Sequence, residues 1–159
     1  MTSISGNSLH YMSKAIALAE QAYANDEVPV GAIIVERETN CIIAESPNRM
    51  REKKNAIYHA EILSIQQACK HLQNERLVGC DIYVSLEPCP MCAHAISIAR
   101  LDNLFFAAED HKSGGVLNGP QIYSSPACHH KPQVYSGIMG DKSSFLLKEF
   151  FKTKRQGSM

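Results

Sequence analysis

The chain has 159 residues, of which 45% are hydrophobic, and its 16 basic residues balance its 16 acidic residues. This hydrophobic content argues against a disordered chain, and the length predicts one domain, residues 1–159, with its own core. The longest apolar runs, such as 28–35, are too short to cross a bilayer. Residues 1–6 lack the basic and apolar regions of a signal peptide, so we expect a cytoplasmic protein.

The first half of the chain predicts two helices separated by a hairpin. A helix from a cap at Asn7 or Ser8 to about residue 24 would bury Leu9, Met12, Ile16, Ala19 and Tyr23. The apolar run 28–35 predicts a strand covered on both faces, and 41–44 predicts its hairpin partner. A second helix begins near His59, and its expected buried face consists of Ile62, Ile65, Cys69 and Leu72.

The second half predicts strands at 81–86, 104–108 and 133–137. A helix at 91–99 is apolar nearly all round and is expected to be buried, with Met91 in the core. The segment 109–132 is a loop of a length typical of functional loops. Ser143 can cap a last helix, whose expected buried side chains are Leu146, Leu147, Phe150 and Phe151. The order of elements predicts an α/β fold: a three-layer α-β-α sandwich around a mixed five-stranded sheet.

Two short motifs carry the predicted chemistry: His59-Ala60-Glu61 and Pro88-Cys89-Pro90-Met91-Cys92. Cys89 and Cys92 share a face at a helix start, where the electropositive helix end favours the thiolates that bind metal. His59 begins another helix, and two helix starts that follow sheet elements can meet at one end of the sheet. One His and two Cys predict a zinc site with an open fourth position, as in catalytic sites.

Glu61 lies beside this set and is the predicted catalytic residue. Zinc lowers the pKa of bound water to about 7. Glu61 would take that proton and then deliver protons to the ring nitrogen and the departing amine of the substrate. This chemistry is hydrolytic deamination, and H-x-E followed by P-C-x-x-C is the signature of zinc-dependent nucleobase deaminases.

Other interpretations of the cysteines and the histidine stay open at this point. A structural zinc site would need a fourth ligand, for which the candidates are His94, Cys80 and Cys128. A thioredoxin-like redox pair would leave His59 unexplained, and a non-enzymatic zinc module would not need Glu61. A disulfide framework is not expected of a chain of this length without a secretory signal.

Further segments are in register with the motifs of one family, and they extend over nearly the whole chain. They are 27–32, Asn48, 59–62, 86–89, 91–93, Asp110-x-Lys112 and 150–151. On these residues the sequence resembles the bacterial tRNA-specific adenosine deaminases of the cytidine-deaminase-like superfamily. The resemblance implies a homodimer with one Zn²⁺ per subunit, and the short apolar runs predict no membrane partner. It also implies deamination of adenosine to inosine at the wobble position, with the tRNA anticodon stem-loop as substrate.

The resemblance also implies roles in substrate binding. Asn48 would hydrogen-bond the flipped base, and the backbone near Ala60 and Leu86 would hold the edge of that base. Asp110 and the loop after it would hold the neighbouring nucleotides. The alternatives are a turn residue for Asn48 and a loop cap for Asp110.

The sequence departs from the family pattern close to the expected substrate entrance. Tyr58 stands where a small residue is usual, 55–57 replace an Asp-Pro-Thr-like stretch, and His129 stands where Asn is typical. We count His129 among the candidate substrate-binding residues. These departures keep one alternative function open, a free-base or nucleoside deaminase acting on guanine or cytosine. The neutral net charge counts mildly against RNA, whereas two basic segments, 49–54 and 152–155, favour it.

Overall fold

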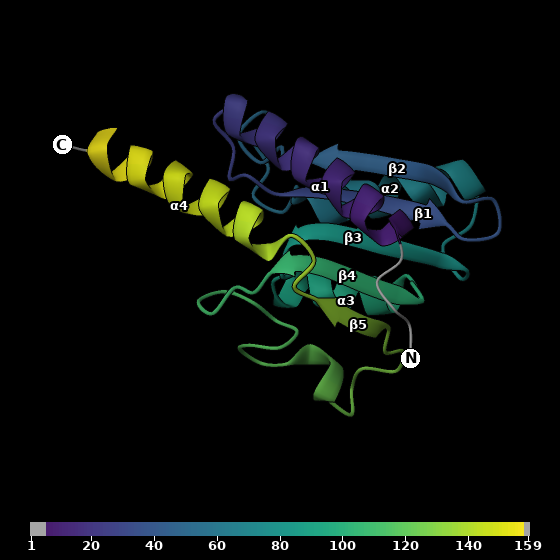
Figure 1. Ribbon diagram of the computed structural model, residues 1–159. Helices are drawn as coiled ribbons and strands as arrows, with labels where there is room; N and C mark the ends of the chain where they lie inside the picture. Colours follow the sequence, from purple (N-terminus) through teal and green to yellow (C-terminus); the bar gives the residue numbers. More distant parts are fainter. Residues whose placement is uncertain (1–5, 158–159) are drawn as a thin grey trace.

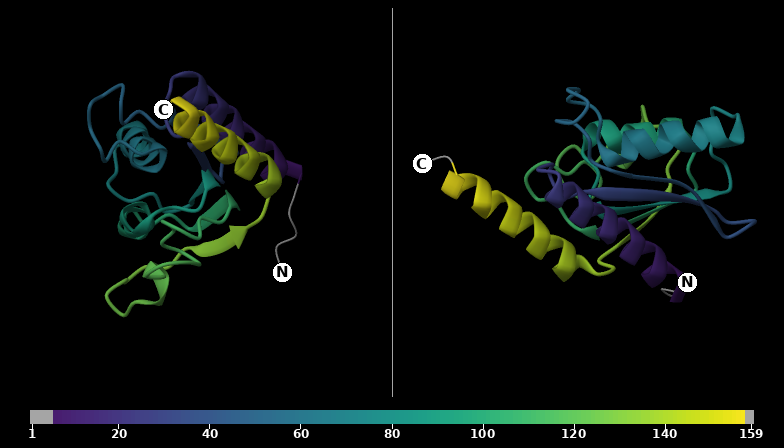
Figure 2. Two further views of the ribbon diagram at one scale, coloured as in Figure 1. Left: turned by 90° about the vertical axis from the view of Figure 1, so that its left-hand side faces the viewer. Right: turned by 90° about the horizontal axis from the view of Figure 1, so that it is seen from above.

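The computed structural model describes residues 6–157 and contains one mixed sheet between two layers of helices (Figure 1). Helices α1 (Gly6–Ala24) and α4 (Gly140–Gly157) cover one face, and α2 (Ala60–Leu72) and α3 (Pro90–Ile98) cover the other (Figure 2). The predicted three-layer sandwich is therefore confirmed. Residues 1–5, where the sequence predicts no signal peptide, lie outside the described part. None of the helices in residues 6–157 has the length and apolarity that a membrane crossing requires.

The sheet has five strands in the order β2-β1-β3-β4-β5. Their bounds are β1 Gly31–Glu36, β2 Cys41–Pro47, β3 Cys80–Leu86, β4 Asn103–Ala108 and β5 Gln133–Ser136. Strand β1 is antiparallel to β2 and β3, whereas β3, β4 and β5 are parallel to one another. The end of β2, the start of β1 and the end of β3 therefore share one edge. The chain leaves the sheet at this edge on its way into both α2 and α3.

Helix α1 crosses β1 so closely that no side chain fits at Gly31. A Cβ there would lie 2.2 Å from the carbonyl oxygen of Ala15 and 2.6 Å from the Cβ of Leu18. The strand predicted at 28–35 begins only at Gly31, because the residues before it form a turn in which the N–H of Val30 bonds the carbonyl of Val28. That turn lies at the same edge of the sheet as the starts of α2 and α3.

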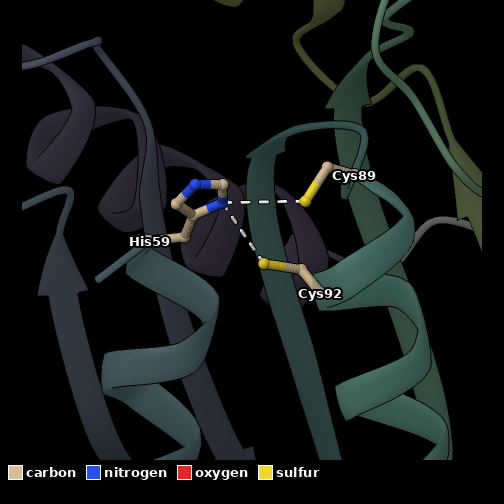
Figure 3. A group of neighbouring side chains, drawn as sticks. All are labelled: His59, Cys89 and Cys92. Atoms are coloured by element: carbon tan, nitrogen blue, oxygen red, sulfur yellow. Dashed lines mark hydrogen bonds between the residues drawn. The ribbon is translucent and has the colours of Figure 1, made fainter. Parts of the chain in front are cut away.

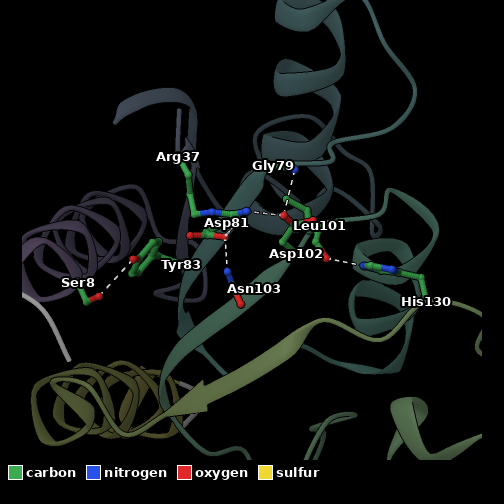
Figure 4. Close-up of polar contacts among 9 residues, drawn as sticks. All are labelled: Ser8, Arg37, Gly79, Asp81, Tyr83, Leu101, Asp102, Asn103 and His130. Atoms are coloured by element: carbon green, nitrogen blue, oxygen red, sulfur yellow. Dashed lines mark hydrogen bonds and ion pairs between the residues drawn. The ribbon is translucent and has the colours of Figure 1, made fainter. Parts of the chain in front are cut away.

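The opposite edge of the sheet is held by polar contacts (Figure 4). Arg37, directly after β1, donates to Asp81 at 2.7 Å and to Asp102 at 2.6 Å. The ring Nε2 of His130 lies 2.7 Å from the carbonyl oxygen of Leu101. These contacts tie the starts of β3 and β4 to the end of β1 and to the segment that leads into β5.

Several residues that the sequence predicts to be buried are exposed on the outer surfaces of the helices. Leu9 is 49% exposed and Phe151 is 44% exposed. Helix α3 is not buried all round, since Met91 and Ile98 lie on a side that no further layer covers. The last helix begins at Gly140, and Ser143 lies inside it, where its hydroxyl donates to the carbonyl of Ser85.

In α2 the deepest line of residues differs from the predicted one. The predicted face of larger residues is only half-buried, and the fully buried residues are Ala60, Glu61, Ser64 and Ala68. Small residues let the helix approach the sheet, and the Ser64 hydroxyl donates to the carbonyl of Ala32 at 3.1 Å. This close approach carries Glu61 into the interior.

Candidate metal and catalytic site

The three predicted metal ligands meet at the edge where α2 and α3 begin. His59 is the N-cap of α2, Cys89 is the N-cap of α3, and Cys92 lies in the first turn of α3. Figure 3 shows the imidazole facing both sulfurs, with Nδ1 3.7 Å from Cys89 Sγ and 3.5 Å from Cys92 Sγ. Within residues 6–157 this is the one group of three or more His, Cys, Asp or Glu side chains with the spacing of metal ligands.

The distances fit a tetrahedral zinc ion. Zinc about 2.3 Å from sulfur and about 2.0–2.1 Å from nitrogen would place these ligand atoms about 3.6 Å apart. The candidate fourth ligands lie elsewhere: Cys80 starts β3 at the opposite edge, His94 is exposed, and Cys128 donates to Ser97 Oγ at 3.2 Å. Three ligands with an open position are typical of a catalytic rather than a structural site.

The two thiols differ: the pKa of Cys89 is lowered, whereas its hydrogen bond to Cys89 and burial raise the pKa of Cys92. A hydrogen bond from the Cys92 thiol and the facing His59 imidazole lower the pKa of Cys89 to about 4, against the opposing effect of burial. The Cys89 thiolate in turn raises the pKa of His59. The position of Cys89 at the start of α3 adds the positive end of the helix dipole. The cluster therefore presents the thiolate that a metal ion requires.

Glu61 is a buried carboxyl in the first turn of α2, only 3% exposed. Burial raises its pKa to about 7. Among the described residues, its Oε1 is the one buried side-chain nitrogen or oxygen without a hydrogen-bond partner. Such an atom costs about 1–3 kcal/mol of stability, so its presence points to function. A carboxyl with a pKa near 7 both accepts and donates a proton at neutral pH.

A cavity of about 210 Å³ lies over the cluster, and its lining includes His59, Glu61 and Cys89. The predicted substrate-binding residues Asn48, Leu86 and Asp110 line the same cavity. Ala60, the remaining backbone position predicted there, is fully buried at the start of α2.

Two of these residues also hold the local backbone. The side-chain Oδ1 of Asn48 accepts the backbone N–H of Ala60 at 2.9 Å, which fixes the first turn of α2. The Asp110 carboxylate accepts the N–H groups of Lys112 and Ser113 at 3.1 and 2.9 Å, as the loop-cap alternative predicts.

The structure does not bring His129 into this cavity. His129 is exposed and lines a separate hollow with His94 and Arg100. Tyr58 does not line the cavity either, and its carbonyl accepts the N–H of Arg49 at 3.2 Å. Of the positions where the sequence departs from the family pattern, neither of these two therefore shapes the cavity wall.

Sequence reasoning missed two buried glutamates that hold the loops beside the cavity. Glu27 accepts the backbone N–H groups of Arg51 and Glu52, at 2.8–3.1 Å. Glu87 accepts five hydrogen bonds from the segment 110–118. Glu87 lies between an apolar strand and the Pro-Cys motif, within the segment 86–89, but nothing at that place in the sequence shows that its side chain is buried.

The sheet, the two helix starts and the cluster of His59, Cys89, Cys92 and Glu61 define a class of protein, the nucleobase deaminases with a cytidine-deaminase-like fold. The model of the MafB19-like deaminase family matches residues 6–155. The tRNA-specific adenosine deaminase of Rickettsia bellii is 49% identical over 144 residues, which cover 91% of this chain and 99% of that protein. The chain belongs to the tRNA-specific adenosine deaminase family, and it is an enzyme that catalyses deamination.

Solved structures agree with this assignment. One, from a study of A-to-I editing by tRNA:A34 deaminases at the wobble position of transfer RNA, superposes with a TM-score of 0.84 at 47% identity. It covers 87% of this chain and 99% of the other. Guanine deaminase from Bacillus subtilis superposes less well, with a TM-score of 0.60 at 40% identity over 63% of each chain. The predicted fold class and family resemblance are confirmed.

Proposed function

We propose that this enzyme hydrolyses adenosine to inosine at the wobble position of tRNA, with Zn²⁺ held by His59, Cys89 and Cys92. The observation that carries the proposal is Glu61, a buried carboxyl with an unpartnered oxygen beside a three-ligand cluster. In this reaction the oxygen of water adds to C6 of adenine, and the amino group leaves as ammonia. The reaction needs one group that moves protons between water, ring and leaving group.

When bound, zinc supplies Lewis-acid activation of the attacking water. Glu61 accepts a proton from this water and donates it to N1 of the ring, which makes C6 a better electrophile. Glu61 then passes the second proton to the amino group as the C6–N bond breaks.

The cavity wall supports binding of a flipped base. The oxygen of the Asn48 side chain is occupied by the N–H of Ala60, and its nitrogen makes only a 3.8 Å contact with the sulfur of Met50. The amide nitrogen of Asn48 is therefore the group left to donate to a base. Leu86 supplies the apolar wall beside it.

The basic segments support an RNA substrate. The Asp26 carboxylate contacts both the guanidinium of Arg51 and the ammonium of Lys154. This contact brings the loop 49–54 beside the C-terminal end of α4, so two basic segments far apart in sequence form one surface. Arginine and lysine on such a surface bind phosphates without reading sequence. The relatives named tRNA-specific adenosine deaminases agree with this substrate.

A tRNA substrate implies a cytoplasmic enzyme, and the family resemblance implies a homodimer. The exposed side chains of Met91 and Ile98 on α3 supply apolar surface for a second copy. Light scattering on the purified protein tests the dimer, and the mass of a single chain would contradict it.

A substrate panel tests the function. We expect the zinc-loaded enzyme to form inosine in an anticodon stem-loop with A at the wobble position. A matched stem-loop with G at that position should be inert, as should guanine, cytosine and their nucleosides. Release of ammonia from guanine or cytosine, with no inosine in the stem-loop, would replace the proposal by the free-base or nucleoside alternative.

A further inference from the structure

We propose that Glu87 is a positioning residue for the deamination: it holds the segment 110–118, one wall of the substrate cavity, against the zinc-binding start of α3. The inference rests on the proposed function. Glu87 itself is 2% exposed, and it follows β3 directly. Two observations carry the inference: the hydrogen bonds that converge on this carboxylate, and the close packing of the segment around it.

Glu87 accepts hydrogen bonds along the whole segment. Its Oε2 accepts the backbone N–H groups of Val116, Leu117 and Asn118 at 3.0, 2.9 and 3.1 Å. Its Oε1 accepts the N–H of Asp110 at 3.0 Å and the side-chain amide of Asn118 at 2.7 Å. One carboxylate thus satisfies both ends of a nine-residue loop, and successive backbone N–H groups form an anion-binding concavity around Oε2.

The packing around the carboxylate leaves the segment little freedom. A Cβ at Gly114 would lie 2.4 Å from Glu87 Oε2. The N–H of Gly115 donates to the carbonyl of Pro88 at 2.8 Å, and a Cβ at Gly115 would lie 2.5 Å from the nitrogen of Pro90. The loop therefore touches the residues on both sides of Cys89.

The contacts join two parts of the site that the sequence keeps apart. Asp110 and Ser113 line the cavity, whereas Cys89 belongs to the metal cluster. All five hydrogen bonds to the Glu87 side chain come from N–H donors, and they are shared between its two oxygens. A side chain that only accepts, with both oxygens, is a carboxylate, and this carboxylate joins the cavity wall to the metal cluster.

The test compares Glu87→Gln with Glu109→Gln in the zinc-loaded enzyme. A glutamine at 87 would turn an amide NH₂ towards groups that are themselves donors. Glu109 is the matched control, because it lies on the same loop, is exposed, and accepts from the same Asn118 amide at 3.3 Å.

Two measurements are made on each variant. Hydrogen exchange should speed up by at least about tenfold at the amides of 116–118 in Glu87→Gln, while α3 keeps its protection. The KM for the anticodon stem-loop should rise at least about tenfold, with kcat within about threefold of wild type and zinc still bound. Glu109→Gln should match wild type in both.

A merely structural role gives another pattern, because a smaller folded fraction lowers kcat and leaves KM unchanged. That pattern, or unchanged exchange at 116–118, overturns the inference. If Glu87→Gln does not fold, Asn118→Ala removes one of the five hydrogen bonds from the loop side, and an unchanged KM in that variant overturns it equally. If the wild-type enzyme acts on guanine and not on the stem-loop, the proposed function fails, and the same KM comparison is made with guanine.

Discussion

Replacing Asn48 by alanine tests how the start of α2 is held. The change removes the oxygen that accepts the N–H of Ala60 at 2.9 Å. Asn48 is 5% exposed and Ala60 is fully buried, so bulk water does not reach this donor. A buried donor left without a partner costs about 1–3 kcal/mol. In a chain of this size each kcal/mol lowers Tm by about 2–4 °C, so Asn48→Ala should melt about 2–12 °C below wild type.

Asn48→Asp separates the structural role of this residue from substrate binding. A carboxylate keeps an acceptor for the Ala60 N–H and is favoured at a helix N-terminus, but it has no amide nitrogen to donate. Circular dichroism melting and the KM for the stem-loop are measured on both zinc-loaded variants. We expect Asn48→Asp to melt close to wild type but to have a raised KM. Asn48→Ala should have both a lowered Tm and a raised KM. A wild-type Tm in Asn48→Ala would refute the hydrogen-bond reasoning, and an unchanged KM in Asn48→Asp would refute the donor role.

Three further predictions concern single side chains. Glu61→Gln should still bind zinc but lower kcat by about 10²–10⁴-fold, because a glutamine side chain cannot transfer protons. Single-turnover inosine formation, with zinc analysis of the same sample, measures this loss. Full activity in the variant would contradict the mechanism. Gly31→Ala should lower the urea midpoint, because its Cβ would lie 2.2 Å from the Ala15 carbonyl oxygen, and an unchanged midpoint would show that α1 can shift. The lowered pKa of Glu87 means that its carboxylate stabilises the folded state above the ordinary value of 4.5, and that this contribution is lost as pH falls through the lowered value. The difference in unfolding free energy between wild type and Glu87→Gln should therefore become smaller in acid. A difference that stays constant down to about pH 3 would show that the charge of the Glu87 carboxylate does not stabilise the fold.

The metal cluster was predictable because each half of it is local. The spacing of Cys89 and Cys92 determines that both sulfurs face one way once Pro90 starts the helix. His59 stands at the other helix start, and both helices follow sheet elements. The sheet order was not predicted, but any arrangement in which these two helix starts share an edge brings the ligands together.

The faces of the helices were less predictable, because apolar periodicity does not say how close a helix lies to the sheet. In α2 the sequence pattern favours the larger apolar residues, yet Ser64 and Ala68 lie deepest, since only small residues fit where the helix approaches β1. In α3 the composition predicts full burial, and Ile98 is nevertheless 65% exposed. No property of the segment itself reveals that its outer side has no neighbouring layer.

The substrate side of the cavity depends on contacts that sequence patterns do not encode. Glu87 binds backbone N–H groups 23 to 31 positions further along the chain, and any residue other than proline offers such a donor. Apart from Asn118, the loop therefore has no side chain that pairs with Glu87 and would reveal the contact in the sequence. Gly114 and Gly115 are the remaining trace, because they mark where the loop must approach Glu87 and Pro90 too closely for a side chain. A glutamate after a strand, followed by a loop with paired glycines, is thus a pattern by which such an anchor can be predicted in other deaminase sequences.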